Sequence, residues 1–491
     1  MVKSGRVTAL LLIATCLFAA TLVGAQVAVS NAEKGQEAYA SGRFSDAVGF
    51  LQQALKEQPG HPVVLCWLGS ACLQLGQLAQ AEGYLRQALA ADPKYAVAYN
   101  NLGNVHLAQG RLAEAEAAYK QAVTLAPDYF DAHFNLANLY LRQGKNEKSW
   151  NEYGRALKLN PNDPDCRINF GLAMQKVGEV DKAIVQYEAA RLLVPQNVSV
   201  LTALGAMYLK VDKFAEARAR YEEALKLNPN GAEAHLGLGI ALHHLNQSEA
   251  ALKSLQRAQE LDPASFPVRY NIGLVYASLH NLSAAEAAYR SALTLQPNDA
   301  VCLNNLGGVV FQQDRADEAA GLFKRAAAAD STLAVAVVNY ALALEGLGKR
   351  DEALAQWRLA VDKFPQEPTA SNGLANAYYE RKQYDEALAS YLMSLNLEPK
   401  NAQAENNVGL IYLAKGNLAQ ATAHFQAALK ISPRFAQAAN NLGVALEKAG
   451  RAEDAKAQYR KALECDPQCK PAKENLDRLS GKAPAGEQET G

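Results

Sequence analysis

The sequence has little cysteine and no excess of basic charge. Seven cysteines are scattered over 491 residues, whereas disulfide-stabilised domains are short and concentrate their cysteines. Only Cys465 and Cys469, in "CDPQC", are close enough in sequence to pair, and their pairing stays open. Lys and Arg number 49 against 50 Asp and Glu, for a net charge of −1. This balance argues against nucleic acid as a partner, because nucleic-acid surfaces require a basic excess.

The sequence also lacks the motifs of common catalytic and metal sites. It contains no GxxxxGK[ST], HExxH, GxSxG, GxGxxG or CxxC. The eight histidines are dispersed, and the adjacent pair His243 and His244 would diverge on a helix rather than hold one ion. We therefore predict no catalytic residue, no metal site and no cofactor, and a protein that is not an enzyme.

Long hydrophobic runs are missing except at the N-terminus. Lys3 and Arg6 precede "VTALLLIATCLFAATLVGAQ", and no charged residue occurs between Arg6 and Glu33. This pattern is typical of a secretory signal over residues 1–25, cleaved after Ala25. The run is also long enough to remain as a membrane anchor, and lipidation of Cys16 is a third alternative. Each alternative predicts an exported chain. It would be periplasmic, or anchored in the membrane and facing outside the cytoplasm, or secreted if the source is a eukaryote.

A period of 34 residues governs the rest of the sequence. "NNLG" occurs at 100–103, 304–307 and 440–443, and "NNVG" at 406–409, so the spacings are multiples of 34. Proline follows the same period, with Ser331 at the one exception: Pro59, Pro93, Pro127, Pro161, Pro195, Pro229, Pro263, Pro297, Pro365, Pro399, Pro433 and Pro467. A fixed period of this length indicates tandem repeats, and we predict thirteen of them over residues 28–469.

Each repeat predicts two amphipathic helices. In the third repeat, residues 96–129, positions 7, 8 and 11 share one face of a first helix, and positions 20, 24 and 27 share one face of a second. Gly110 at position 15 allows the turn, and Pro127 at position 32 ends the second helix. Position 8 is glycine or alanine throughout. Because helical glycine costs about 1 kcal/mol relative to alanine, the repeated glycine predicts a close approach of helices.

At these positions the chain resembles the tetratricopeptide repeat family, whose pattern has Leu-Gly at positions 7–8, Ala at 20 and 27, an aromatic residue at 24 and Pro at 32. The resemblance implies an all-α fold, a right-handed α-solenoid superhelix of about thirteen helix-turn-helix units with a concave groove. The repeats of this chain are similar to those of O-linked N-acetylglucosamine transferase and of exported bacterial repeat proteins. Unlike the transferase, this chain has no room for a catalytic domain beside its repeats. Residues 470–481 predict a polar capping helix and residues 482–491 a disordered tail.

The resemblance implies that positions 2, 5, 6, 9, 12 and 13 of each first helix line the groove. Asparagine occupies position 6 in eight of the thirteen repeats and position 5 in five, and we expect both amides of each "NN" pair on the open face, with apolar groups between them. The predicted peptide-binding residues are Asn100, Asn101, Asn135, Asn169, Asn271, Asn304, Asn305, Asn339, Asn406, Asn407, Asn440, Asn441, Trp67, Phe134 and Tyr270. The amides match the backbone of an extended peptide, or they belong to the general repeat pattern and satisfy local groups. The apolar residues contact a ligand or pack against the neighbouring repeat.

The predicted function is a non-enzymatic scaffold outside the cytoplasm that binds extended segments of partner proteins in its groove, within an assembly or export complex. The alternative is a regulatory or substrate-presenting subunit of an envelope enzyme or secretion channel, acting through its convex face. No repeat has Lys or Arg at positions 2, 5 or 6, so a clamp for the carboxylate of a heat-shock chaperone is not expected. The predicted partner is a protein or peptide, not a small molecule. Its identity and the oligomeric state stay open.

Overall fold

The structure is a computed structural model, and it describes residues 30–480. Within this range all regular secondary structure is α-helical, which confirms the predicted all-α fold. The predictions for residues 1–25 and 482–491 lie outside the described residues. No helix among residues 30–480 has the length and apolar character needed to span a membrane.

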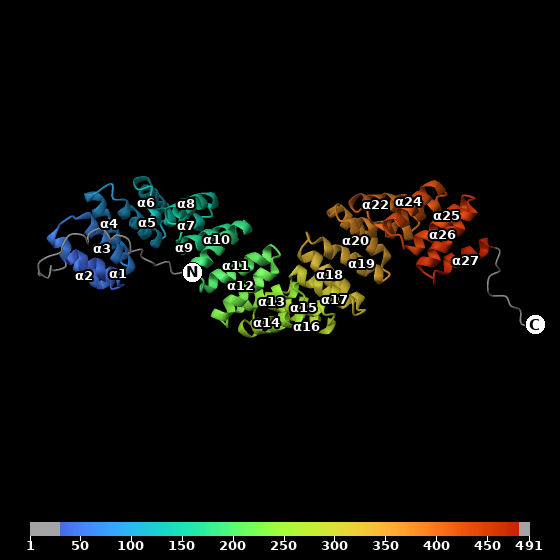
Figure 1. Cartoon of the computed structure of the whole chain (residues 1–491), viewed down its shortest axis with the longest axis horizontal. Helices are drawn as coiled ribbons and strands as arrows, with labels where there is room; N and C mark the ends of the chain where they lie inside the picture. Colours follow the sequence, from blue (N-terminus) through green and yellow to red (C-terminus); the bar gives the residue numbers. More distant parts are fainter. Residues whose placement is uncertain (1–29, 481–491) are drawn as a thin grey trace, which may run out of the picture. The chain divides into compact units, whose positions relative to one another are not determined.

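The described residues form two compact units that divide between Leu245 and Asn246. Figure 1 labels most of the helices of both units. The first unit contains α1 (Asn31–Ala40), α2 (Phe44–Glu57), α3 (Pro62–Gln74), α4 (Leu78–Ala91), α5 (Ala96–Ala108), α6 (Leu112–Leu125), α7 (Phe130–Arg142), α8 (Asn146–Leu159), α9 (Pro164–Lys176), α10 (Val180–Leu193), α11 (Val198–Lys210), α12 (Phe214–Leu227) and α13 (Ala232–His244).

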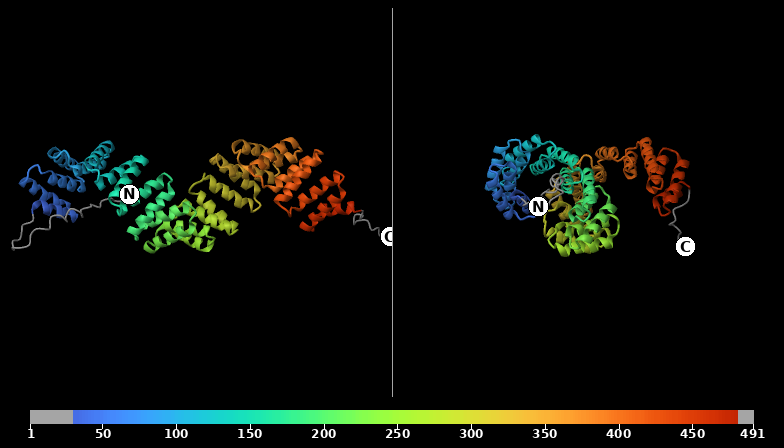
Figure 2. Two further views of the ribbon diagram at one scale, coloured as in Figure 1. Left: turned by 45° about the horizontal axis from the view of Figure 1, so that its top comes forward. Right: turned by 60° about the vertical axis from the view of Figure 1, so that its left-hand side comes forward.

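The second unit contains α14 (Ser248–Leu261), α15 (Phe266–Ser278), α16 (Leu282–Leu293), α17 (Ala300–Phe311), α18 (Ala316–Ala329), α19 (Ala334–Gly346), α20 (Arg350–Lys363), α21 (Pro368–Glu380), α22 (Tyr384–Leu397), α23 (Ala402–Ala414), α24 (Leu418–Ile431), α25 (Ala436–Lys448), α26 (Ala452–Cys465) and α27 (Lys470–Leu479). Odd-numbered helices up to α25 are first helices of repeats, and even-numbered helices are second helices. Figure 2 shows these successive helix pairs from two further directions.

The turn inside each repeat depends on a left-handed residue at position 15. All thirteen residues at this position have positive φ, from 55° at His280 to 83° at Gly178. In the third repeat the N–H of Arg111 donates to the carbonyl of His106 at 2.9 Å, as in a Schellman motif. Glycine adopts this conformation without strain and occupies position 15 in eight of the thirteen repeats, whereas the other five have Asp212, Asn246, His280, Asp314 and Lys382 there.

The two helices of a repeat approach each other closely at position 8. A Cβ atom added to Gly103 would lie 2.5 Å from Cε1 of Tyr119, whose ring is fully buried. The same approach to the position-24 side chain recurs at Gly35, Gly69, Gly171, Gly205, Gly273, Gly307, Gly409 and Gly443. The predicted role of the small residue is confirmed at these positions: a larger side chain would separate the helices.

Stacking of repeats places the first helices on the inner side of each unit. Consecutive first helices contact one another, as α3 with α5 and α17 with α19 do. Consecutive second helices do not reach one another to this extent among the described residues. Each unit is therefore an α-solenoid whose first helices line its inner face, which we define as the exposed side of these helices.

Polar residues cover the two ends of the described array. In α1, Lys34 and Glu37 are exposed at positions 7 and 10, where later repeats bury apolar residues, and Ser30 forms a capping box with Glu33. At the other end α27 packs on α26, with Leu476 and Leu479 against the core of the last repeat. Polar outer faces of this kind are typical of the terminal helices of repeat arrays.

Candidate functional site: the inner face of the first helices

The position-6 asparagines lie half-buried on the inner face and hydrogen-bond to the preceding repeat. Asn135 Nδ2 donates to Asn100 Oδ1 at 3.0 Å, and Asn339 donates to Asn304 in the same way at 3.0 Å. Asn441 donates to Asn406 at 3.0 Å. In each case the partner is 35 residues earlier, at position 5 of the preceding repeat. These bonds join one repeat to the next.

The first asparagine of each "NN" pair is not on the open face. Asn100, Asn304, Asn406 and Asn440 are only 2–8% exposed. The expectation that both amides face the groove is therefore wrong for these four residues. Their amides are buried because each accepts the bond from the next repeat, and Asn440 accepts one at 3.1 Å from Asn475 of α27.

The other position-6 amides use acceptors that are not a position-5 asparagine, and most of these acceptors lie in the preceding repeat. Asn305 donates to the hydroxyl of Tyr270 at 2.9 Å, and Asn407 donates to the hydroxyl of Tyr391 at 3.0 Å. Asn101 donates to Ser70 Oγ at 2.9 Å and Asn169 to Asn138 Oδ1 at 3.1 Å. Asn271 differs, because it donates to the carbonyl of Pro267 in its own helix at 2.7 Å.

We call the position-6 asparagines, together with Asn475, the asparagine ladder. The amide oxygen remains available in part of the ladder, whereas those of Asn101, Asn407, Asn441 and Asn475 accept hydrogen bonds from neighbouring side chains. The Oδ1 atoms of Asn135, Asn169, Asn305 and Asn339 accept no hydrogen bond within residues 30–480. Each of these four amides also has a second N–H, so each of the four offers a donor and an acceptor on the inner face. These groups match the C=O and N–H of an extended peptide backbone.

Position 9 and position 24 complete this network. The sequence placed position 9 in the groove, but position 24 was predicted only as a packing position. Tyr119 donates from its hydroxyl to Asn104 Oδ1 at 2.7 Å, and Tyr153 donates to Asn138 Oδ1 at 2.5 Å. Burial raises the pKa of the Tyr119 hydroxyl well above its usual range, so it stays protonated and donates. The signal in the sequence is an asparagine 15 residues before an aromatic residue.

The three predicted aromatic site residues are half-buried and packed. The Trp67 ring meets Tyr39 edge-on, with centroids 5.1 Å apart. Phe134 stacks on Phe130 at 5.8 Å, and Tyr270 stacks on Phe266 at 5.9 Å. Each ring therefore contributes to helix packing while presenting one edge or face at the inner side.

Two gaps in the ladder have a steric cause. Position 6 is glycine at Gly237 and Gly373. A Cβ atom at Gly373 would lie 2.6 Å from Cε2 of Trp357, and a Cβ atom at Gly237 would collide with the Tyr221 ring. At these two places the large position-24 side chain of the preceding repeat occupies the space that an asparagine would need.

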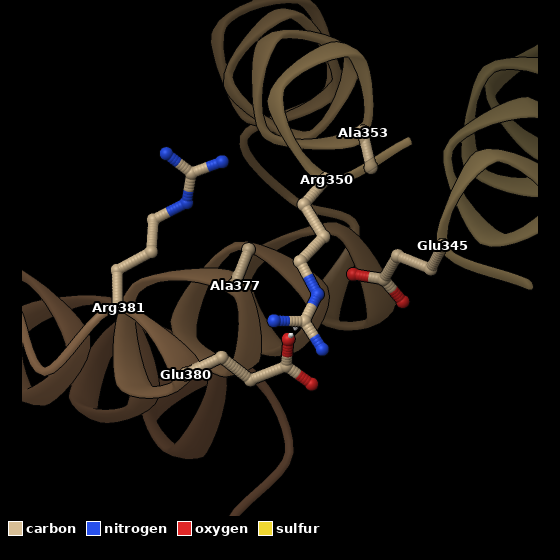
Figure 3. A pocket seen from close by; sticks show the side chains of 6 residues that line it. All are labelled: Glu345, Arg350, Ala353, Ala377, Glu380 and Arg381. Atoms are coloured by element: carbon tan, nitrogen blue, oxygen red, sulfur yellow. Dashed lines mark ion pairs between the residues drawn. The ribbon is translucent and has the colours of Figure 1, made fainter. Parts of the chain in front are cut away.

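A small hollow in the second unit lies between the tenth and eleventh repeats. Figure 3 shows Arg350 pointing toward Glu380, with Nε 3.6 Å from Oε2, and Arg381 pointing away. Glu345 accepts a hydrogen bond from Trp357 Nε1 at 2.7 Å, and burial is the main cause that raises its pKa. Acids and bases are mixed here, so the hollow has no net preference for a charged ligand. Among residues 30–480 no three His, Cys, Asp or Glu residues are placed to hold a metal ion.

The six cysteines of the described residues are free thiols, including Cys465 and Cys469. Burial raises the pKa of the Cys66 thiol to about 11, so it is neutral at physiological pH and accepts a weak hydrogen bond from Asn101. The cysteines act as small packing residues.

Profiles of one repeat family match most of the chain. Profiles described as "Tetratricopeptide repeat" match residues 38–103 and 76–123, and residues 202–266, 270–334, 340–404 and 406–468. A profile described as "TPR repeat" matches residues 103–144 and 137–178. The chain belongs to the tetratricopeptide repeat family. Its repeat architecture is that of a scaffold for protein–protein interaction.

Solved structures of repeat proteins resemble the chain at low identity. The Cut9–Hcn1 hetero-tetramer of the APC/C is 13% identical, with a TM-score of 0.40 over 91% of this chain and 95% of that one. Yeast Tom70 is 18% identical, with a TM-score of 0.37 over 92% and 94%. YrrB, described as having an unusual peptide-binding site, is 21% identical, with a TM-score of 0.34 over 40% and 97%. Comparison with curated proteins gives no significant match.

Proposed function

We propose that the protein is a non-catalytic scaffold whose inner face binds extended segments of partner proteins. The observation that carries the proposal is the half-used asparagine ladder. One N–H of nearly every ladder amide bonds to the preceding repeat, which fixes the orientation of the amide. The free oxygens of residues such as Asn305 and Asn339 then lie on the inner face, one repeat apart. A fixed row of amides recognises peptide backbone with little loss of side-chain entropy.

We further propose that this scaffold acts outside the cytoplasm, in an assembly or export complex. The proposal rests on Lys3, Arg6 and the apolar run that follows them in the sequence. Mass spectrometry of the protein from its native cell would test it, because a mature N-terminus at Gln26 requires export and cleavage. An intact Met1 together with recovery in the cytosol would contradict export.

Photo-crosslinking from the two faces of one repeat tests the proposed binding surface. A benzophenone amino acid replaces Gln437 on the exposed side of α25, or Ala457 on the exposed side of α26, in the full chain. In extract of the native cell we expect the Gln437 variant to label a recurrent linear segment of a partner. A synthetic peptide of that segment should then bind the purified full chain without any other protein.

The matched Ala457 variant addresses the alternative function. A regulatory or substrate-presenting subunit that acts through its second helices would label its partner from Ala457 and not from Gln437. Labelling of that kind, or a partner that binds only as a folded domain, would contradict the inner-face proposal.

A further inference from the structure

The inner face of the ninth and tenth repeats carries an apolar patch. We define the patch as Val301, Gly308 and Phe311 of α17 with Val335 and Leu342 of α19. The four side chains are 41–47% exposed, although each is large and hydrophobic. The two helices contact each other, and Phe311 Cε2 lies 3.7 Å from the place that a Cβ atom on Gly346 would occupy. The patch is therefore one continuous surface across two repeats.

Charge is missing from this part of the inner face. Positions 2, 6, 9 and 13 share one side of each first helix, because their spacing follows the helical period. In the fourth repeat this side carries Asp131 and Arg142, and in the fifth it carries Asp165 and Lys176. In the ninth and tenth repeats none of the four positions is charged. Glu345 is the one charged residue of α17 and α19, and it bonds to Trp357.

Gly308 opens a notch in the patch. Position 9 is leucine in the eighth repeat and again at Leu342 in the tenth, but glycine between them. A Cβ atom on Gly308 would meet no other atom within 4 Å. At the neighbouring Gly307, the Phe323 ring occupies the space that a side chain would need, so the two glycines have different roles. Gly308 leaves space that a side chain from outside can occupy.

We propose that the apolar patch binds an uncharged, extended segment of a partner protein, with an aliphatic side chain in the notch at Gly308. This inference rests on the peptide-binding function proposed above and specifies the ligand of one part of the inner face. The free Oδ1 atoms of Asn305 and Asn339 flank the patch and accept N–H groups of the bound backbone. A charged side chain is excluded because it would lose water here without gaining an opposite charge.

Selection of displayed random nonapeptides on the purified full chain tests this inference. Wild-type protein and the Gly308→Leu variant are used in parallel. We expect wild-type protein to enrich uncharged peptides with a central Leu, Ile or Val, and the variant to lose them, since its added side chain fills the notch. For a selected peptide, fluorescence anisotropy should show binding at least about tenfold weaker to the variant, a loss of 1.4 kcal/mol or more.

A matched pair of charge substitutions in the tenth repeat provides the control. Leu342→Glu on α19 should weaken the same peptide about tenfold or more. Leu359→Glu on α20 should leave binding unchanged, although Leu359 is similarly exposed at 38%. Hydrogen exchange of both variants shows whether either substitution alters folding.

Each other outcome overturns the inference in a distinct way. Selected peptides that are charged, or that bind Gly308→Leu as well as wild type, refute the apolar ligand but leave peptide binding in place. If no peptide is selected, both the inference and the proposed function fail. If the full chain self-associates in sedimentation and Leu342→Glu abolishes this, the patch is an interface between copies and the inference is wrong.

Discussion

Two single substitutions in α17, Gly307→Leu and Gly308→Leu, separate the effect of packing on stability from the effect of helix propensity. A Cβ atom on Gly307 would lie 2.7 Å from Cε1 of Phe323, whereas one on Gly308 meets nothing within 4 Å. Phe323 is only 3% exposed, so its ring has little room to move. Both glycines lie in the interior of one helix, so both substitutions should gain about 0.5–1 kcal/mol of helix propensity.

The packing term then decides the sign for each variant. Ordinary contact begins near 3.4 Å, so Phe323 must move by several tenths of an ångström for Cβ alone, and leucine adds three further carbons. Overpacking of this kind costs about 1–3 kcal/mol. We expect Gly307→Leu to lower local stability and Gly308→Leu to raise it slightly. The gain in helix propensity is common to both variants and cancels. Their local free energies of unfolding should therefore differ by the overpacking cost, about 1–3 kcal/mol.

Hydrogen exchange of α17 and α18, followed by mass spectrometry, measures this difference where it arises. A repeat array unfolds by local steps, so a single melting temperature would average over distant repeats. A difference of 1–3 kcal/mol corresponds to roughly 5- to 150-fold in protection of the slowest amides. Equal protection in the two variants would refute the reasoning that position 8 is a steric constraint.

Three further substitutions should change stability in stated directions, measured by the same exchange experiment. Lys382→Gly should stabilise the turn of the eleventh repeat by about 0.5–1 kcal/mol, because lysine at φ 59° is strained and glycine is not; unchanged or lower protection would contradict this. Asn304→Ala should lower local stability by about 1 kcal/mol, because it removes the acceptor of the Asn339 amide; unchanged protection would show that water replaces this acceptor without loss. Ser371→Ala should stabilise α21 by about 1 kcal/mol, because its buried hydroxyl has no hydrogen-bond partner among residues 30–480; a loss of stability would reveal a bond to water.

The sequence predicted the helices well because one signal is repeated thirteen times. In the third repeat, positions 1–13 and 17–30 correspond to α5 and α6, bounded by Gly110 and followed by Pro127. Hydrophobic period, turn glycine and proline all agree there, so no single weak signal has to decide. The division between Leu245 and Asn246 has no such signal, since the 34-residue period continues through it.

The site was predicted less well because a repeat position does not reveal its partner. Asn100 and Asn101 are neighbours of the same chemical type, yet the first is 3% exposed and the second is half-buried. What separates them is Asn135, which lies 35 residues later and donates to Asn100. Periodicity within one helix cannot show that bond, because it depends on how the next repeat stacks.

The proposed use of the ladder amides for both ligand and repeat contacts would couple ligand binding to repeat stacking. If Asn339 binds a peptide through Oδ1 while its N–H bonds to Asn304, the two interactions reinforce each other, since hydrogen bonds in series polarise the shared amide. A ligand that binds only the stacked form must also stabilise the stacking, by linkage. Replacing Asn305 and Asn339 together with alanine should therefore weaken both ligand capture and stacking. Residues outside the ladder, such as Leu342 and Leu359, are needed to separate the two effects, because neither forms a hydrogen bond between repeats through its side chain.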